Sequence, residues 1–497
     1  MASRCGTPFA YIHGVANPSK LQNTSHINMR RMSKAVATSD SLVVSGAAVS
    51  ALSRRRFMGT AAALGAAGAL AACGKKEAEA RASPPPVAAA DAGAKKYAGQ
   101  SLNLLFNQPH ALAGKLLAQE FEALTGAKVT VTPVPYDQLH AQATLDVQSG
   151  AHQFDVIDYF YHTLGALVAD KVVVDVTDRI ERDSAQIEPG DFLPSLYDTY
   201  TLRNGRRWGL PYDGDTHVLF YNTEIFARHG LSAPRTWDDY YNAARLITEK
   251  ESANGIYGAV VQGFKIPVIV GSSYANRLAG FGGSFFTPDG KPALTSPQAV
   301  AAAEELARIV PYALPTPAET AFEHALPAFL SGKAAMIDFW TDLGVTAQDP
   351  ASSKIVDKWA LVQLPVGGDN KTPRAALNAG FGLGIAAGTQ KTELAWDFIK
   401  WATSKDISLR QDVLPGSGID PNRTSVLNHP DYIKAAPQLQ PQLKAAIGDA
   451  LAWPLQAQSP KLMDALTEQL ALIVSGRRKP REALEAAQAS WVQLLDA

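Results

Sequence analysis

Cysteine is scarce in this chain of 497 residues, which holds only Cys5 and Cys73. Two thiols, one of them in a predicted leader, cannot form a disulfide framework or a multi-cysteine zinc or iron–sulfur site. The sequence also lacks the motifs H-E-x-x-H, Cys-x-x-Cys, Walker A and G-x-S-x-G, which mark common metal, redox, nucleotide and hydrolase sites. Its ten histidines show no ligand spacing. We therefore expect neither a metal nor a cofactor.

An excess of one charge is also missing, since 46 Lys and Arg residues stand against 47 Asp and Glu residues. The balance conceals a basic segment, because residues 1–72 hold eight basic side chains and a single acidic one, Asp40. The remainder has 38 basic and 46 acidic residues, a net charge of −8. A surface of that sign is unsuited to nucleic acid or anionic lipid, so no nucleic-acid partner is expected.

The basic segment ends in an export signal. The stretch SRRRFMG at residues 53–59 is followed by a short run of small apolar residues and a small-residue cleavage site. The apolar run from Met58 to Ala72 has 15 residues, fewer than the roughly 20 of a membrane span. Arg54 and Arg55 resemble the arginine pair of a twin-arginine signal. Translation from either Met1 or Met32 is compatible with the sequence.

The leader closes with Leu70-Ala71-Ala72-Cys73, which resembles the lipobox of bacterial lipoproteins. The resemblance implies cleavage before Cys73 and lipidation of its thiol, whereas the alternative is a chance cysteine at the end of a plain signal. Residues 73–100 are poor in bulky apolar residues and rich in Ala, Pro and charge, as in a solvated tether. We therefore predict a leader at 1–72, a tether at 73–100 and a periplasmic, lipid-anchored protein.

From Ser101 onward, strand and helix patterns alternate on short loops. An apolar strand at 101–107 precedes a helix that ends at Gly126, and an alternating strand follows at 128–134. This alternation predicts a mostly parallel sheet with helices on both faces. In such sheets ligands bind beyond the carboxyl ends of the strands.

Six segments in this part of the chain occur in an order typical of one family: FEALTG-KVTV, SG-(x)4-DV, YNTEIFARHGLSAPRTWDDY, AFLSGKAAM, AWDFIKWATS and SGRRKPREALEAAQASW. From Ser101 to the C-terminus the chain resembles the extracellular solute-binding proteins of ABC importers, the group that includes maltose-binding protein. The resemblance implies a monomeric binder that delivers a carbohydrate or sugar alcohol to an inner-membrane permease, and no enzymatic activity.

The same resemblance implies a fold of the α/β class, a type II periplasmic-binding-protein fold with two α/β lobes that close by hinge motion. Its crossings between lobes are expected near Gly214 and Gly380. The predicted boundaries are 101–213 plus 382–420 for lobe 1 and 214–381 plus 421–497 for lobe 2.

Candidate ligand residues are the aromatic, acidic and amide side chains near the predicted strand ends. Aromatic faces stack on the C–H face of a sugar, and carboxylates or amides bind its hydroxyl groups. The candidates are Gln108, Tyr136, Asp158, Tyr159, Asp213, Asp215, Tyr274, Trp340, Asp342, Phe381 and Arg423.

Several of these assignments have structural alternatives. The carboxylates of Asp213 and Asp215 can be satisfied by backbone N–H groups in a turn. Tyr159 and Trp340, which align with stacking aromatics of the family, can equally belong to the core. Arg423 suits an anionic group of the ligand or a salt bridge to a neighbour.

Two other function classes stay open. The ligand could be another small polar solute, namely a polyamine, which suits the acidic cluster, or a phosphorylated polyol, which needs more basic residues. The chain could also be an exported oligosaccharide hydrolase that uses Asp213 and Asp215 as its paired carboxylates. The stretch GLGIAA at 382–387 mimics a Rossmann fingerprint but lies inside a predicted late strand, so it is not taken as one.

Overall fold

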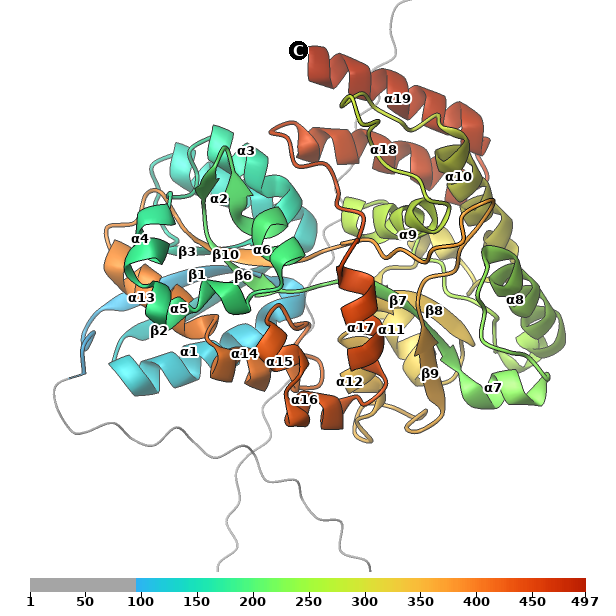
Figure 1. Cartoon of the computed structure of the whole chain (residues 1–497), viewed down its shortest axis with the longest axis horizontal. Helices are drawn as coiled ribbons and strands as arrows, with labels where there is room; N and C mark the ends of the chain where they lie inside the picture. Colours follow the sequence, from blue (N-terminus) through green and yellow to red (C-terminus); the bar gives the residue numbers. More distant parts are fainter. Residues whose placement is uncertain (1–94) are drawn as a thin grey trace, which may run out of the picture. The chain divides into compact units, whose positions relative to one another are not determined.

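The computed structural model describes residues 95–497, so the predicted leader, Cys73 and most of the tether lie outside the described residues (Figure 1). Tyr97 is already part of the fold: its side chain is buried, and its N–H donates to the carbonyl of Thr125 at 2.9 Å. The folded part thus begins before Ser101, inside the segment predicted as tether. Among the described helices, none is both long enough and apolar enough to cross a membrane.

The larger of two main sheets has the strand order β2-β1-β3-β10-β6. Strands β1, β2 and β3 are parallel, and β10 is antiparallel to both β3 and β6. The prediction of a mostly parallel sheet is therefore confirmed, with β10 as the reversed strand. Its strands are β1 (Ser101–Asn107), β2 (Lys128–Val134), β3 (Val156–Phe160), β6 (Leu210–Asp213) and β10 (Phe381–Ile385).

Helices cover this sheet on both sides, with α1 and α14 below it and α2, α3 and α6 above it in Figure 1. Helix α1 ends at Gly126, which adopts the left-handed conformation (φ 75°) that glycine tolerates best, as predicted for this C-cap. We call this assembly the first lobe. Its helices are α1 (Ala111–Thr125), α2 (Leu139–Gln148), α3 (Leu164–Ala169), α4 (Thr177–Arg182), α5 (Ser184–Ile187), α6 (Pro194–Thr201), α13 (Thr392–Ala402), α14 (Lys405–Asp412) and α15 (Thr424–Leu427), with a small hairpin of β4 (Leu202–Arg203) and β5 (Arg206–Arg207).

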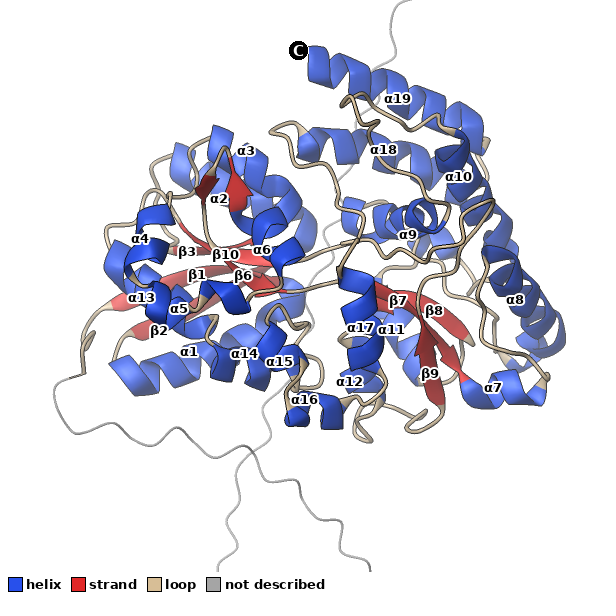
Figure 2. Cartoon of the chain, in the orientation of Figure 1, coloured by secondary structure: helices blue, strands red, loops and turns tan. Residues whose placement is uncertain are grey.

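The second main sheet is antiparallel, with the order β8-β7-β9, and forms the centre of what we call the second lobe (Figure 2). Thr236 begins helix α8 with a capping box, because its hydroxyl accepts from the N–H of Asp239 and the Asp239 carboxylate accepts from the N–H of Thr236. The strands are β7 (His217–Asn222), β8 (Met336–Trp340) and β9 (Trp359–Val362), and the helices are α7 (Thr223–Arg228), α8 (Trp237–Glu251), α9 (Ser272–Gly280), α10 (Pro297–Ile309), α11 (Phe322–Leu330), α12 (Leu343–Ala347), α17 (Leu439–Ile447), α18 (Ser459–Val474) and α19 (Pro480–Asp496).

The chain passes between the two sheets at glycines. Gly214 lies between β6 and β7, and a Cβ at this position would collide with the carbonyl oxygen of Pro421. Gly380 immediately precedes β10, has φ 108°, and lies against the hydroxyl of Tyr200. Only glycine fits such backbone without strain. Phe381 is already the first residue of β10, where it pairs with Phe160.

The segment after residue 420 stays with the first lobe, although the predicted boundaries assign it to the second. The carbonyl of Asn422 accepts from the N–H of Leu193, and Arg423 pairs with Asp191 at 3.3 Å. Helix α16 (Pro430–Ala435) follows, and α17 then contacts β7 of the second lobe.

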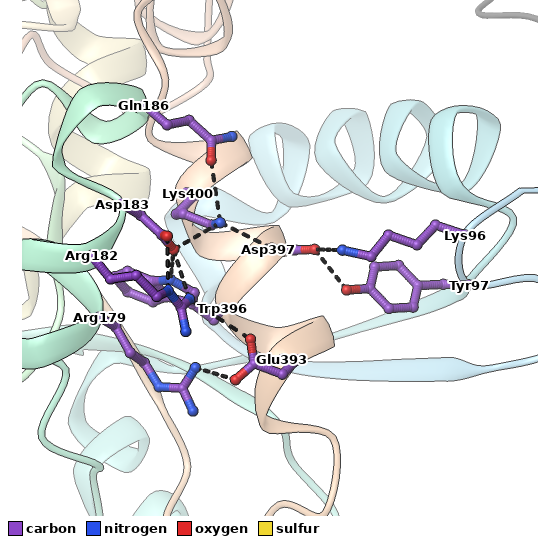
Figure 3. A network of polar contacts seen from close by, with 10 residues as sticks. All are labelled: Lys96, Tyr97, Arg179, Arg182, Asp183, Gln186, Glu393, Trp396, Asp397 and Lys400. Atoms are coloured by element: carbon purple, nitrogen blue, oxygen red, sulfur yellow. Dashed lines mark hydrogen bonds and ion pairs between the residues drawn. The ribbon is translucent and has the colours of Figure 1, made fainter.

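A polar network fixes the first described residues to helix α13 (Figure 3). The carboxylate of Asp397 accepts from Lys96 at 2.5 Å and from the hydroxyl of Tyr97 at 2.6 Å. Lys400 lies 3.0 Å from both Asp397 and Asp183, which extends the network to the α4–α5 region. Arg182, with Lys400, lowers the pKa of Asp183, and Lys96, with the Tyr97 hydroxyl and Lys400, lowers the pKa of Asp397 against its partial burial. The chain therefore enters the fold at a fixed point on the first lobe.

Candidate functional site

A cavity of about 420 Å³ is lined by residues from both lobes. Its volume is at the lower end of the range of roughly 300–1,000 Å³ typical of small-molecule sites. The lining residues are Asn107, Gln108, Pro109, His110, Pro135, Tyr136, Asp137, Asp215, Phe264, Ile266, Val268, Ile269, Ala321, Phe322, Glu323, Trp340, Asp342, Ala379, Phe381 and Gly418.

The first lobe contributes the segments that follow its strands. The 3₁₀ helix η1 (Gln108–His110) follows β1, η2 (Tyr136–Gln138) follows β2, and Asp215 lies just after β6. Because β1, β2 and β6 run in the same direction, their carboxyl ends meet at one edge of the sheet. The cavity therefore lies where the sequence predicted a ligand site.

The second lobe contributes an aromatic and aliphatic wall. Trp340 is the last residue of β8, and its ring packs edge-on against His217 with centroids 4.4 Å apart. The ring of Phe322, at the start of α11, lies 5.9 Å from that of Trp340. The π-helix η6 (Pro267–Gly271) adds the side chains of Val268 and Ile269. This wall offers flat apolar faces to a ligand.

A buried cation lies behind the first-lobe wall. The Nδ1 atom of His110 is 2.7 Å from Oδ2 of Asp158, and its Nε2 atom is 3.4 Å from Oδ2 of Asp213. Burial alone would lower the pKa of His110, but these two carboxylates outweigh it and raise the pKa to about 10. His110 is thus charged at neutral pH, and its charge is shared between two carboxylates.

Carboxylates gather at the junction of the lobes. Oxygens of Asp213, Asp215 and Asp420 lie within 4.8 Å of one another, and all three side chains are buried. The N–H of Asp420 donates to Oδ1 of Asp213 at 2.8 Å. Burial and the neighbouring carboxylates raise the pKa values of Asp215 and Asp420 well above the usual range. Burial, together with Asp213, also raises the pKa of Asp342 to about 7.

Three lining residues carry buried polar atoms without a hydrogen-bond partner in the described part of the chain: Oδ1 of Asn107, the hydroxyl of Tyr136 and Nε1 of Trp340. Buried polar groups in folded proteins almost always have a partner. A ligand with both donors and acceptors would supply these partners.

Six of the predicted ligand residues line the cavity: Gln108, Tyr136, Asp215, Trp340, Asp342 and Phe381. The other five lie outside the lining: Asp158, Tyr159, Asp213, Tyr274 and Arg423. Asp158 and Asp213 lie behind the cavity lining, where their carboxylates contact the imidazole of His110.

The placement of Tyr159, Tyr274 and Arg423 corrects their assignment as ligand contacts. Tyr159 packs against Gly209 and Gly382, and its hydroxyl donates to the carbonyl of Tyr200 at 3.1 Å. The Tyr274 hydroxyl, inside helix α9, donates to the carbonyl of Ala299 at 3.3 Å. Arg423 makes the alternative salt bridge, since its guanidinium pairs with Asp191.

Sequence reasoning missed His110, Asp420 and Phe322 as members of the site. His110 belongs to the loop after β1, which was singled out for its amides. Asp420 lies three residues before Arg423. Sequence reasoning therefore predicted a site residue in this segment but chose Arg423 instead of Asp420. The sequence around Phe322 gave no comparable signal.

Comparisons with known proteins agree on one protein family. The model for bacterial extracellular solute-binding proteins matches residues 110–407. The probable amino-acid ABC transporter periplasmic-binding protein y4oP of Sinorhizobium fredii is 25% identical over 402 residues, which cover 78% of this chain and 88% of the relative. The erythritol/L-threitol-binding protein of Mycolicibacterium smegmatis is 24% identical over 358 residues, 67% of this chain and 72% of the relative.

Among solved structures, the chain is similar to an ABC transporter solute-binding protein from Agrobacterium radiobacter K84 in complex with ribitol. The two superpose with a TM-score of 0.72 at 27% sequence identity, over 80% of this chain and all of the other.

Proposed function

The chain belongs to the family of bacterial extracellular solute-binding proteins, and on that premise we propose that it captures a small carbohydrate or sugar alcohol for an ABC importer. The observation that carries the proposal is the pairing, in one cavity between the lobes, of the flat face of Trp340 with unpartnered polar atoms of Asn107 and Tyr136. A polyhydroxylated solute offers C–H faces to the first and hydroxyl groups to the second.

The relatives support this ligand class. The structure at 27% identity holds ribitol, and the Mycolicibacterium relative is named for erythritol and L-threitol. A cavity of about 420 Å³ suits a solute of that small size better than a long oligosaccharide. We therefore favour a monosaccharide or a short sugar alcohol.

The two alternatives fit the site less well. A phosphorylated polyol needs Arg or Lys donors, and none is present among the lining residues of the cavity. A hydrolase needs two carboxylates that flank the scissile bond, and the predicted pair is Asp213 and Asp215. Asp213 lies outside the cavity lining, where its carboxylate contacts His110 and the N–H of Asp420. Binding without turnover is the function that this geometry favours.

We propose that capture closes the two lobes about the crossings at Gly214 and Gly380, which brings Trp340 over a solute already bound by the first lobe. A ligand can drive closure only through its greater affinity for the closed form. The leader and Cys73 further suggest twin-arginine export and a lipid anchor, so the monomeric binder would work at the periplasmic face of a membrane beside its permease.

A thermal-shift screen of residues 95–497 against pentoses, hexoses and sugar alcohols tests the proposal. At 100 times its dissociation constant, a ligand stabilises the fold by about 2.7 kcal/mol, a shift of several degrees at most. A hit that is recovered unchanged after prolonged incubation supports capture without turnover. A hit that is consumed contradicts it in favour of the hydrolase.

A further inference from the structure

The charges that line the cavity are unbalanced. Four lining residues are acidic, namely Asp137, Asp215, Glu323 and Asp342, and the sole basic residue in the lining is His110. His110 contributes little free positive charge, because Asp158 and Asp213 already surround it. A neutral sugar needs one or two carboxyl groups to bind its hydroxyl groups, so this cavity holds more acidic side chains than a neutral solute requires.

The imbalance continues behind the lining. Asp213 and Asp420 lie against Asp215, and Asp412 is a further buried carboxyl group, whose pKa is raised well above its usual value by burial and by Asp420 and Asp213. All four side chains are at least nine-tenths buried. Carboxylates this close in a low-dielectric site repel one another strongly when ionised. A positive charge from outside the chain would relieve that repulsion.

An unpartnered acceptor beside these carboxyl groups calls for a donor, while the unpartnered Nε1 donor of Trp340 calls for an acceptor that a hydroxyl group of the ligand would supply. Asn107 lines the cavity and is 1% exposed, and its Oδ1 atom has no hydrogen-bond partner in the described part of the chain. This atom can only accept. The rings of Trp340 and Phe381 line the same cavity, and aromatic faces attract cations.

From this cavity we propose that the natural ligand carries an ammonium group that binds at Asp215 and Asp342, so that it is an amino sugar or an amino-substituted sugar alcohol. The inference rests on the proposed function, since the rest of the ligand is taken to be a polyhydroxylated skeleton. An ammonium group has three donors and one charge, which matches two carboxylates and an amide oxygen better than a hydroxyl group does.

Binding of the ammonium group would release protons. In the empty cavity burial and the neighbouring carboxyl groups raise the pKa values of Asp215 and Asp420, and the pKa of Asp342 is raised to about 7, so Asp342 is partly protonated at pH 7. A bound cation favours the ionised form, so a carboxyl O–H bond breaks and its proton passes to the buffer while the ammonium keeps its own protons. A neutral ligand gives no such release.

A divalent metal ion is the competing source of positive charge, because the oxygens of Asp213, Asp215 and Asp420 are close enough to share one ion. We favour the ligand ammonium because Asp215 and Asp342 both line the cavity beside aromatic faces, whereas Asp213 and Asp420 lie outside the lining.

The test is calorimetric titration with matched solutes: glucose, glucosamine and N-acetylglucosamine, and sorbitol with 1-amino-1-deoxysorbitol, each in two buffers of different ionisation enthalpy. We expect the amine to bind at least tenfold more tightly than its neutral partners and to release protons. Equal or tighter binding of the neutral partners overturns the inference and leaves the proposed function intact. Tight binding of spermidine without any sugar supports the cationic site and overturns the polyhydroxylated skeleton.

Calcium and magnesium chloride alone form a separate arm, and stabilisation by either metal without a sugar overturns the inference. A substitution gives a second, independent readout. Asp342→Asn keeps the shape of the side chain and removes its charge, so it should cut the affinity for the amine at least tenfold more than it cuts the affinity for the neutral partner. Asp369→Asn, at an exposed position away from the cavity, is the matched control. Equal losses for both ligands with Asp342→Asn contradict the proposal.

Discussion

The Nδ1 atom of His110 lies 2.7 Å from Oδ2 of Asp158, and neither side chain is exposed to solvent. Removal of one partner from a buried ion pair leaves the other charge uncompensated, at a cost of about 3–5 kcal/mol. His110→Ala should therefore lower the free energy of unfolding by about that amount, as measured by urea denaturation at pH 7. His429, whose side chain is 42% exposed, supplies the control substitution, His429→Ala.

The sign of the pH dependence follows from the raised pKa of His110, which is about 10 in the folded protein and about 6.5 in the unfolded chain. Its stabilisation is complete below pH 6.5 and is lost as the pH rises through 10. The double variant His110→Ala, Asp158→Ala should lose less than the sum of the single losses. Strict additivity would show that the two side chains do not act as a pair.

Trp340→Ala should weaken ligand binding about ten- to a hundredfold. The substitution removes an aromatic face and the unpartnered Nε1 donor, each worth about 1 kcal/mol or somewhat more. Titration calorimetry with the solute found in the screen measures the loss. Trp401→Ala, on helix α13 against Phe121, is the comparison, and a similar loss in both variants would place the effect in overall stability.

Affinity for 1-amino-1-deoxysorbitol, whose alkylamine stays protonated across this range, should fall as the pH is lowered from 8 to 6. Asp342, whose pKa is raised to about 7, becomes protonated over this interval and can then no longer pair with an ammonium group. The groups that act on it are Asp213, Asp420 and Tyr432, together with the cation His110. Affinity measured at four pH values should follow this single titration and become flat in Asp342→Asn. A rise in affinity on acidification would refute the assignment.

Gly380→Ala should destabilise the protein by about 1–3 kcal/mol, because alanine is strained at φ 108° and its Cβ would strike the Tyr200 hydroxyl. Gly190→Ala is the matched control, since a Cβ there meets nothing within 4 Å. Thermal unfolding of both variants, with and without ligand, separates a loss of stability from a loss of binding. Equal melting temperatures for the two variants would count against a strained crossing at Gly380.

Cys73→Ala should move the full-length protein from the membrane fraction to the soluble fraction of cells that express it. The expected reason is loss of the thiol that the lipobox-like sequence presents for lipidation. Fractionation with Cys5→Ala alongside is the control. A wild-type protein that is already soluble would argue against the anchor.

Local signals in the sequence predicted local structure well. Gly126 is recognisable as a helix end because it acts on the helix to which it belongs, and that prediction is confirmed. The strand ends were also recognisable, so the place of the cavity followed from the order of strands and helices. Family resemblance identified Trp340 within this frame.

The other site residues could not be predicted, because their positions depend on how separate strands and segments pack together. Asp158 and Tyr159 are adjacent in β3 and therefore point to opposite faces of the sheet, and the sequence does not say which face meets the cavity. Neither residue reaches it: the first holds His110, and the second packs against Gly209. Asp420 reaches Asp215 only because the chain returns to the first lobe after β10, a contact between distant segments that no local pattern predicts.

The network of Lys96, Tyr97 and Asp397 has a mechanical consequence. Because the N-terminal segment is bonded to α13, a pull on that segment is borne by the first lobe and does not pass through the crossings at Gly214 and Gly380. If the lobes close about these crossings, the second lobe is the part that moves relative to the segment of Lys96 and Tyr97. The first lobe then stays in place during closure. The permease would contact this fixed lobe and the second lobe, which moves as the solute is enclosed.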